Sequence, residues 1–321
     1  MGGEHSGVVE IMSDVAFLFP GQGAQAVGMG RDLAEANPAC RAWFDRASEI
    51  LGYDLATICF EGPLETLTQS SHAQPGIFVT SLAAWTAIQE RAPGLSMKAA
   101  AGLSSGEWTA LHLAGVVGFE DTLKILEARG RLMQAACTAT PGSMLSVIGA
   151  EPEQLAHLCA ESGAEIANLN SREQTVISGT REAIDRAEGL AKDVGIRKAI
   201  RLNVAGAFHS TLMKPAAEQF AGVLASISFQ APSFPVYANL TGRPHEADGD
   251  AIRESMISQV YSSVHWYQSV EAIVAGGTTT FLECGPGKVL AGLVKRIDKT
   301  AKVHSIQDQS GLEGLAGFLA G

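Results

Sequence analysis

Residues 97–117 read MKAAAGLSSGEWTALHLAGVV, and this stretch decides the fold. Its first part has small side chains, which let a following helix pack close to a strand, and residues 107–117 have a helical pattern. Between them, Gly102-Leu103-Ser104-Ser105-Gly106 is a Gly-x-Ser-x-Gly turn, in which a strand passes sharply into a helix and exposes the central serine. The pattern predicts Ser104 as a nucleophile at the edge of a sheet. A Ser/Gly-rich surface turn is the alternative at this point.

A serine hydroxyl needs a base, and the segment Gly206-Ala207-Phe208-His209-Ser210 offers one. We expect Ser210 to cap a helix running to Leu224, which places His209 near the positive end of the helix dipole. That setting favours the neutral imidazole that a general base must be. No other histidine of the chain has a comparable setting, although most histidines are simply partly buried or exposed polar residues.

Arg129 is singled out by helical geometry within the stretch from Glu120 to Cys137. At about 100° per residue, apolar side chains gather around Arg129 and most charged ones fall on the far side. A guanidinium does not lose its proton to escape burial, so it must meet an anion or line a wet cleft. Two interpretations stay open: an internal salt bridge, and a clamp for a substrate carboxylate that fits the planar fork.

The predicted strands and helices alternate along the chain, as in an α/β fold. Between residues 142 and 204 the order of predicted elements changes. There the elements read β-α-β-β-α-β, the ferredoxin-like pattern, with spans 144–148, 153–160, 165–169, 175–178, 181–194 and 198–202. Outside it we predict strands at 15–19, 234–238 and 279–284 and a helix at 74–91 opened by Pro75. Ser104 and Arg129 precede the changed region and His209 follows it, so the site should lie in a cleft between the two parts.

The chain has 321 residues, is 46% hydrophobic and carries a formal net charge of −11. This balance argues against nucleic acid as a partner, because phosphate binding needs concentrated Lys and Arg. No apolar run approaches the roughly 18 residues that span a membrane. Five cysteines without a Cys-x-x-Cys pair, and no leader, predict reduced thiols in a cytoplasmic protein. We expect no cofactor and no metal, since nucleotide loops and Cys/His clusters are absent from the sequence.

Five segments recur together, in this order, in one known family: residues 17–25 (FLFPGQGAQ), 102–107 (GLSSGE), 129–134 (RGRLMQ), 206–210 (GAFHS) and 283–288 (ECGPGK). They resemble the signatures of malonyl-CoA:acyl carrier protein transacylases over nearly the whole chain. The resemblance implies an α/β-hydrolase-like core with a parallel sheet, formed by residues 14–141 and 205–321. It carries a small ferredoxin-like α+β subdomain at 142–204, and residues 1–13 are expected to be a flexible extension.

The resemblance also implies a role for each matching position. Ser104 would carry the malonyl group as an ester, and His209 would take the serine proton. The backbone N–H groups of Gln22 and Ser105 would form the oxyanion hole. The main-chain carbonyl of Gln259 would orient the histidine where many serine enzymes use an aspartate.

The resemblance also implies which residues set the selectivity for the acyl group. Arg129 matches the arginine that grips the free carboxylate of malonate. Phe208 is typical of malonyl-selective members, because its ring crowds the space of an α-methyl group, a discrimination of about 1 to 3 kcal/mol. Leu103 stands where many relatives have histidine, and Ser105 where an aliphatic residue is common. Both departures affect the polarity of the acyl pocket and remove no catalytic atom.

The sequence therefore predicts transfer of malonyl from malonyl-CoA to the phosphopantetheine thiol of acyl carrier protein, through a malonyl-serine intermediate. Alternatives are a serine acyl-hydrolase, a transacylase for another acyl-CoA, and a catalytically idle docking subunit of a lipid or polyketide assembly. The acidic net charge of the chain would repel an acidic carrier protein, so local basic clusters are the candidate docking sites for the carrier. These are Arg197, Lys198, Arg201 and Lys214, and a second group of Lys295, Arg296 and Lys299.

Overall fold

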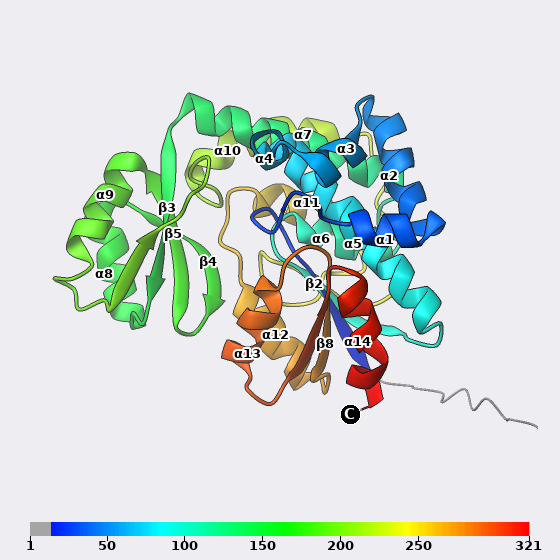
Figure 1. Ribbon diagram of the computed structural model, residues 1–321. Coiled ribbons are helices and arrows are strands. Elements are labelled where there is room, and N and C mark those ends of the chain that lie inside the picture. The colour runs from blue at the N-terminus through cyan, green and yellow to red at the C-terminus, as the bar shows by residue number, and fades with distance from the viewer. Residues whose placement is uncertain (1–13, 321) are drawn as a thin grey trace, which may run out of the picture.

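A five-stranded parallel sheet forms the centre of the molecule, with strand order β7-β2-β1-β8-β9 (Figure 1). The computed structural model describes residues 14–320, so the predicted flexible extension lies outside the described residues. All five strands point the same way, which confirms the parallel sheet expected from the sequence. The strands are β1 (Val15–Phe19), β2 (Met97–Gly102), β7 (Val236–Tyr237), β8 (Thr280–Cys284) and β9 (Lys302–Ile306).

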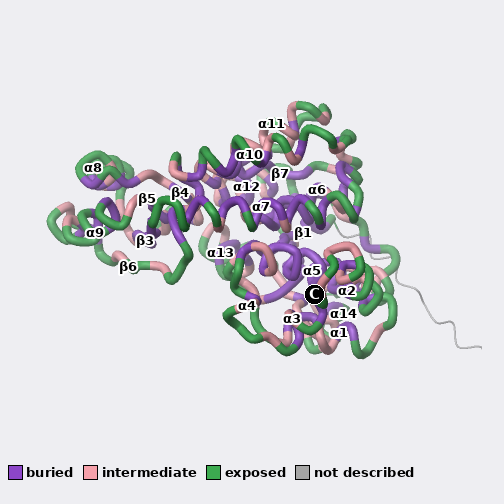
Figure 2. Tube along the Cα trace, turned by 90° about the horizontal axis from the view of Figure 1, so that it is seen from above, coloured by how far each residue is buried: buried purple, intermediate pink, exposed green. Residues whose placement is uncertain are grey.

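Helices cover both faces of this sheet, as a buried parallel sheet requires. Alternate residues of β1 point to opposite faces: Phe17 joins the larger core beneath α5 and α7, whereas Leu18 joins the core beneath α12 and α13. Figure 2 shows buried residues concentrated along β1, α5 and α7. The helices of this part are α1 (Arg31–Ala36), α2 (Pro38–Leu51), α3 (Leu55–Glu61), α4 (Leu64–Thr68), α5 (Ser70–Arg91), α6 (Gly106–Leu113), α7 (Phe119–Ala139), α10 (Lys214–Leu224), α11 (Gly249–Gln259), α12 (Trp266–Ala275), α13 (Val289–Ile297) and α14 (Gln309–Ala320).

Residues 142–204, called the insert here, carry a second sheet that is antiparallel, with order β4-β5-β3-β6. Helices α8 and α9 pack on one face of it, which gives the ferredoxin-like arrangement. In Figure 1 the insert extends to one side of the parallel sheet. Its elements are β3 (Gly142–Ile148), α8 (Pro152–Ser162), β4 (Glu165–Ser171), β5 (Gln174–Thr180), α9 (Arg181–Leu190) and β6 (Lys198–Arg201).

Helix α5 differs from its prediction, because it begins at Ser70 rather than at Gln74 and contains Pro75 in its interior. A proline removes one helical N–H and so leaves the carbonyl four residues earlier without its usual partner. That carbonyl belongs to Ser71, and it accepts a hydrogen bond of 3.4 Å from the Tyr53 hydroxyl. The helix can therefore start one turn before the proline. Within residues 14–320, no helix is both long enough and apolar enough to span a membrane.

Candidate active site

Ser104 lies in the sharp turn between β2 and α6, with φ 54°, in the left-handed region that non-glycine residues rarely adopt. The flanking glycines allow the turn: a Cβ at Gly102 would lie 2.0 Å from the Gly106 carbonyl carbon, and one at Gly106 would lie 2.2 Å from the carbonyl oxygen of Phe19. The N–H of Ser104 donates to Oδ1 of Asn239 at 2.7 Å, so the turn is held by the segment that follows the neighbouring strand β7. The serine side chain is thereby fixed above the sheet.

The His209 imidazole lies between Ser104 and Gln259. Its Nε2 is 2.8 Å from Oγ of Ser104, and its Nδ1 is 2.9 Å from the main-chain oxygen of Gln259. Because a carbonyl oxygen only accepts, Nδ1 carries the hydrogen and, in the neutral ring, Nε2 is free to accept the serine proton. Burial, and next the positive charge of Arg129, lower the pKa of His209 from 6.5 to about 4. The ring is therefore neutral at pH 7.

The expected helix cap at Ser210 is wrong. Ser210 Oγ donates to the main-chain oxygen of Ala207 at 2.7 Å and accepts no bond from a helix N–H. A short 3₁₀ turn, Thr211–Met213, follows, and α10 begins only at Lys214. Burial and next the nearby guanidinium lower the pKa of His209, and so account for its neutral state without a cap at Ser210.

Arg129 is buried on α7, with 1% of its surface exposed. Its Nη1 donates to Oε1 of Gln74 at 2.9 Å, and its Nη2 donates to Oε1 of Gln259 at 2.9 Å and to Oγ of Ser104 at 3.2 Å. Its partners among the described residues are amide and hydroxyl oxygens, so the salt-bridge interpretation is wrong. Burial lowers the pKa of the guanidinium to about 10. A buried cation without a bound carboxylate is suited to receive one from a ligand.

The loop after β1 brings Gln22 to the nucleophile turn. Its N–H donates to Oγ of Ser105 at 3.2 Å, so the two residues predicted to form an oxyanion hole are in direct contact. The loop can lie this close to the nucleophile turn because residue 21 is glycine: a Cβ there would lie 2.1 Å from the carbonyl oxygen of Leu103. The side chain of Gln22 donates to Oγ of Ser70 at 2.9 Å, which fixes the loop against α5.

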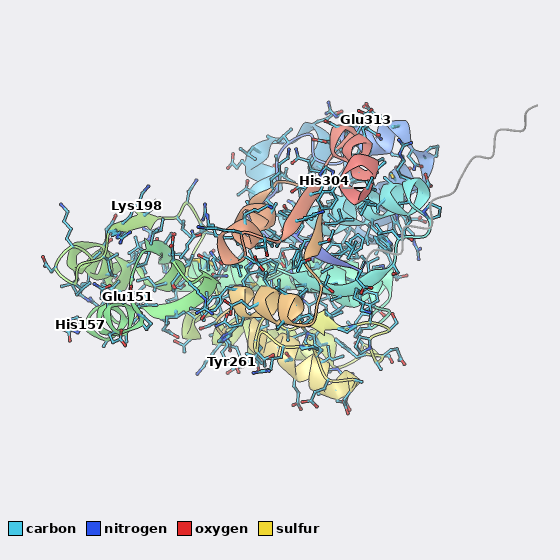
Figure 3. The ribbon with its side chains drawn as sticks, turned by 90° about the horizontal axis from the view of Figure 1, so that it is seen from below. Glu151, His157, Lys198, Tyr261, His304 and Glu313 are labelled. Atoms are coloured by element: carbon cyan, nitrogen blue, oxygen red, sulfur yellow. The ribbon has the colours of Figure 1, made fainter. Side chains whose placement is uncertain are left out.

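A cleft of about 1210 Å³ contains these groups and is lined by residues of both the parallel-sheet part and the insert. Ser104, His209 and Arg129 all line it, as do the two residues predicted to set acyl selectivity, Leu103 and Phe208. The ring of Phe208 packs against the small core formed by Met144, Ala167 and Val176 on the open face of the insert sheet. By contrast, Figure 3 shows His157 on the outer side of the insert and His304 beside α14.

Comparison with known proteins gives a consistent result. Residues 16–310 match the family model described as acyl transferase domain. The malonyl CoA-acyl carrier protein transacylase of Bacillus subtilis (strain 168) is 40% identical over 307 residues, which cover 94% of this chain and 96% of that protein. This chain belongs to the malonyl CoA-acyl carrier protein transacylase family. The resemblance drawn from the sequence is therefore confirmed.

Solved structures of the transacylase family share the fold. The malonyl CoA-acyl carrier protein transacylase of Coxiella burnetii superposes with a TM-score of 0.91 at 35% identity, covering 96% of this chain and 98% of that one. A malonyl-transacylase in complex with a type II PKS acyl-carrier protein superposes with a TM-score of 0.89 at 39% identity, covering 94% of this chain and 98% of that one. The α/β fold with its second, antiparallel sheet is thus that of the family.

Four residues of this transacylase site were not predicted: Gln74, Glu107, Asn239 and His245. Glu107 offered a signal, because it is an acidic residue in a mainly apolar helix, three residues after the nucleophile. Asn239 also offered one, because it follows a parallel strand whose carboxyl end adjoins the nucleophile turn. Gln74 is a buried amide on a mainly apolar stretch of α5. His245 lies in a loop and carried no signal.

Proposed function

We propose that this protein transfers a malonyl group from malonyl-CoA to the phosphopantetheine thiol of an acyl carrier protein, for fatty acid or polyketide synthesis. One observation carries the proposal. Oγ of Ser104 lies 2.8 Å from Nε2 of His209 and 3.2 Å from Nη2 of Arg129. A nucleophile, a neutral base and a buried cation at one point suit an acyl group that bears its own carboxylate.

In the first step, Nε2 of His209 takes the proton of Ser104 while Oγ attacks the thioester carbonyl of malonyl-CoA. The oxygen of the tetrahedral intermediate is stabilised by the N–H groups of Gln22 and Ser105, at roughly 3 kcal/mol per donor. For this, the Gln22 N–H turns from the Ser105 hydroxyl toward the oxyanion. Collapse breaks the C–S bond, CoA leaves with the proton from His209, and a malonyl ester remains on Ser104.

The second step repeats this chemistry with a different thiol. His209 deprotonates the phosphopantetheine thiol of the carrier, and the sulfur attacks the ester carbonyl. The bond to Ser104 Oγ breaks, and the proton returns from His209 to that oxygen. The carbonyl of Gln259, 2.9 Å from Nδ1 of His209, keeps the ring in the same tautomer through both steps.

Selectivity comes from the groups around the acyl chain. The Arg129 guanidinium binds the free carboxylate of malonate, so acyl groups without one lose this contact. The ring of Phe208 limits the space beside the α-carbon, and Leu103 makes the neighbouring wall apolar where many relatives place a histidine. Because packing against one methyl group is worth only about 1 to 3 kcal/mol, exclusion of methylmalonyl is incomplete.

The reaction needs no cofactor, since every proton and charge it moves is handled by a side chain or a backbone N–H of the site. Malonyl-CoA and the acyl carrier protein are the partners, and neither nucleic acid nor a membrane takes part. Reduced cysteines fit a cytoplasmic location, and all five are free thiols in the structure.

Mass spectrometry of the protein mixed with malonyl-CoA tests the proposal. We expect one malonyl mass on the peptide containing Ser104, lost when an acyl carrier protein with its phosphopantetheine arm is added and retained with a carrier that lacks the arm. The Ser104→Ala variant is the control for site specificity. Loss of the label to water alone would indicate a hydrolase, and no label at all would indicate an idle docking subunit.

A further inference from the structure

Glu107 is a fully buried carboxylate in the first turn of α6, three residues after the nucleophile. Its Oε1 accepts a hydrogen bond of 2.7 Å from Nε2 of His245, whose side chain is also buried. Its Oε2 accepts bonds of 2.6 Å from Nε2 of Gln259 and 3.2 Å from the N–H of Asn239. Both oxygens are satisfied, which a buried carboxylate requires.

The side-chain amide of Gln259 links this carboxylate to the guanidinium. Its Oε1 accepts from Nη2 of Arg129 at 2.9 Å, while its Nε2 donates to Glu107 and to the main-chain oxygen of Ser104 at 2.9 Å. The amide has one orientation that satisfies both charges, because the cation needs an acceptor and the anion needs a donor. A flipped amide would present its NH₂ group to Arg129.

This arrangement separates the two buried charges by one amide. Glu107 is the charge that raises the pKa of Arg129 against the larger effect of burial, yet it does not contact the guanidinium. A direct salt bridge from Glu107 would occupy the guanidinium of Arg129 and compete with the carboxylate of a substrate. With the amide interposed, Glu107 offsets the cost of burying the cation, and within residues 14–320 the guanidinium meets only neutral acceptors, which a substrate carboxylate can displace.

We infer that Glu107, anchored by His245, is a positioning residue that orients Arg129 through the side-chain amide of Gln259 and thereby sets the preference for acyl groups that carry a carboxylate. The inference rests on the proposed malonyl transfer and adds to it a residue that touches neither acyl group nor thiol. It also gives Gln259 a second task, since its main chain holds His209 while its side chain holds Arg129.

The test compares rates of Ser104 acylation by malonyl-CoA and acetyl-CoA in the Glu107→Gln variant. With the charge removed, the Gln259 amide loses the anion that fixes its orientation, so we expect kcat/KM for malonyl-CoA to fall roughly tenfold or more. The value for acetyl-CoA, which has no carboxylate to bind, should fall less than threefold. The malonyl-to-acetyl ratio is unaffected by a smaller folded fraction, because misfolding lowers both rates equally.

The matched control is Glu283→Gln. Glu283 is another fully buried carboxylate, but it accepts bonds from the N–H groups of Leu290 and Ala291 and from the Ser305 hydroxyl, away from Arg129. We expect this variant to keep the wild-type ratio. If Glu107→Gln does not fold, His245→Gln removes the other anchor of the same carboxylate and should lower the ratio in the same direction.

A double-mutant cycle with Gln259→Met separates positioning from a general structural effect. The methionine removes both ends of the amide and keeps the carbonyl that holds His209. If Glu107 acts through the amide, adding Glu107→Gln to this variant changes the ratio no further. An unchanged ratio in the single variant, or full additivity in the double variant, overturns the inference. Failure of the wild-type protein to label Ser104 would instead overturn the proposed function.

Discussion

Ser104 and His209 are the only non-glycine residues with positive φ in residues 14–320, at 54° and 55°. Such conformations cost about 1 to 3 kcal/mol each and persist only where surrounding bonds hold them. Here the holding bonds are visible: Asn239 fixes the N–H of Ser104, and the Gln259 carbonyl fixes the ring of His209. Both strained residues meet at one hydrogen bond, so the strain lies where the chemistry is proposed.

The coupling of Arg129 to His209 predicts a pH effect. Arg129 is the second cause, after burial, of the lowered pKa of His209. Replacing it by methionine removes that cause, so the pKa should rise above about 4 while burial keeps it below 6.5. A raised pKa means that the imidazole becomes protonated, and inactive as a base, at a higher pH. In the Arg129→Met variant, the acid limb of the pH profile of the acylation rate should therefore move to higher pH.

The measurement is kcat/KM for acetyl-CoA against pH, since acetyl does not use the guanidinium. Lys124→Met is the control, because Lys124 is an exposed cation on the same helix, paired with Glu120. Its acid limb should coincide with that of the wild-type protein. An Arg129→Met limb that stays in place, or moves to lower pH, would contradict the electrostatic coupling.

The site residues that the sequence singled out by itself share one property, which is a local signal. Ser104 stands between glycines, His209 stands in a short motif, and Arg129 interrupts an apolar helix face. The contacts that were missed join distant segments: Glu107 and His245 are 138 residues apart, and only the folded chain brings them together. Gln259 was found through family resemblance, because a main-chain carbonyl leaves no side-chain signature.

At the scale of elements, the position of Arg129 depends on how closely α7 crosses α5. The next residue, Gly130, faces the start of α5, where a Cβ would lie 2.2 Å from the carbonyl oxygen of Ser70. Alanine normally stabilises a helix interior by about 1 kcal/mol relative to glycine. At this crossing it must instead push the two backbones apart, which costs on the order of 2 kcal/mol.

We therefore expect Gly130→Ala to lower the free energy of unfolding and, by moving Arg129, to slow malonyl transfer more than acetyl transfer. Gly222→Ala on α10 is the matched control, because a Cβ there meets nothing within 4 Å. That variant should be slightly more stable than the wild-type protein. Urea denaturation and the two acylation rates give the comparison; a Gly130→Ala protein with wild-type stability and ratio would show that the crossing is not close.

The order of elements was predictable because hydrophobic periodicity reports on it directly. The insert has the expected β-α-β-β-α-β order of elements, and the nucleophile turn is flanked by the expected strands. Element ends were less predictable, since they depend on tertiary partners. The Tyr53 hydroxyl lets α5 start before Pro75, and Ser210 bonds backward to Ala207 instead of capping α10.

At the scale of the whole molecule, the cleft lies between the two parts of the chain, and the net charge is −11. An acidic carrier must then approach through a local basic surface. Of the two candidate clusters, one is already partly neutralised, because Arg201 is ion-paired with Asp185 and Glu188. In the other, Lys295 and Arg296 donate to uncharged oxygens of Ala301 and Gln174, and the structure shows neither in an ion pair among residues 14–320.

Helix α13 connects this second cluster to the cleft. Val289 and Leu290 at its start line the cleft, and Lys295 follows about 9 Å further along the helix. A carrier bound to Lys295 and Arg296 would thus lie beside the opening that its phosphopantetheine arm must enter. We expect the double reversal Lys295→Glu and Arg296→Glu to raise KM for the carrier about tenfold at low salt, with less effect at high salt because exposed charges are screened.

Acylation by malonyl-CoA alone should change less than twofold in this variant, since the reversal lies outside the site. The matched comparison is Arg197→Glu with Lys198→Glu, of equal charge change, at the start of the edge strand β6 of the insert, where Figure 3 shows Lys198. Unchanged carrier kinetics for the first pair at low salt would remove α13 from the docking surface. An equal rise in KM for the carrier in both double variants would mean that the net charge of the protein, rather than a local docking site, governs the approach of the carrier.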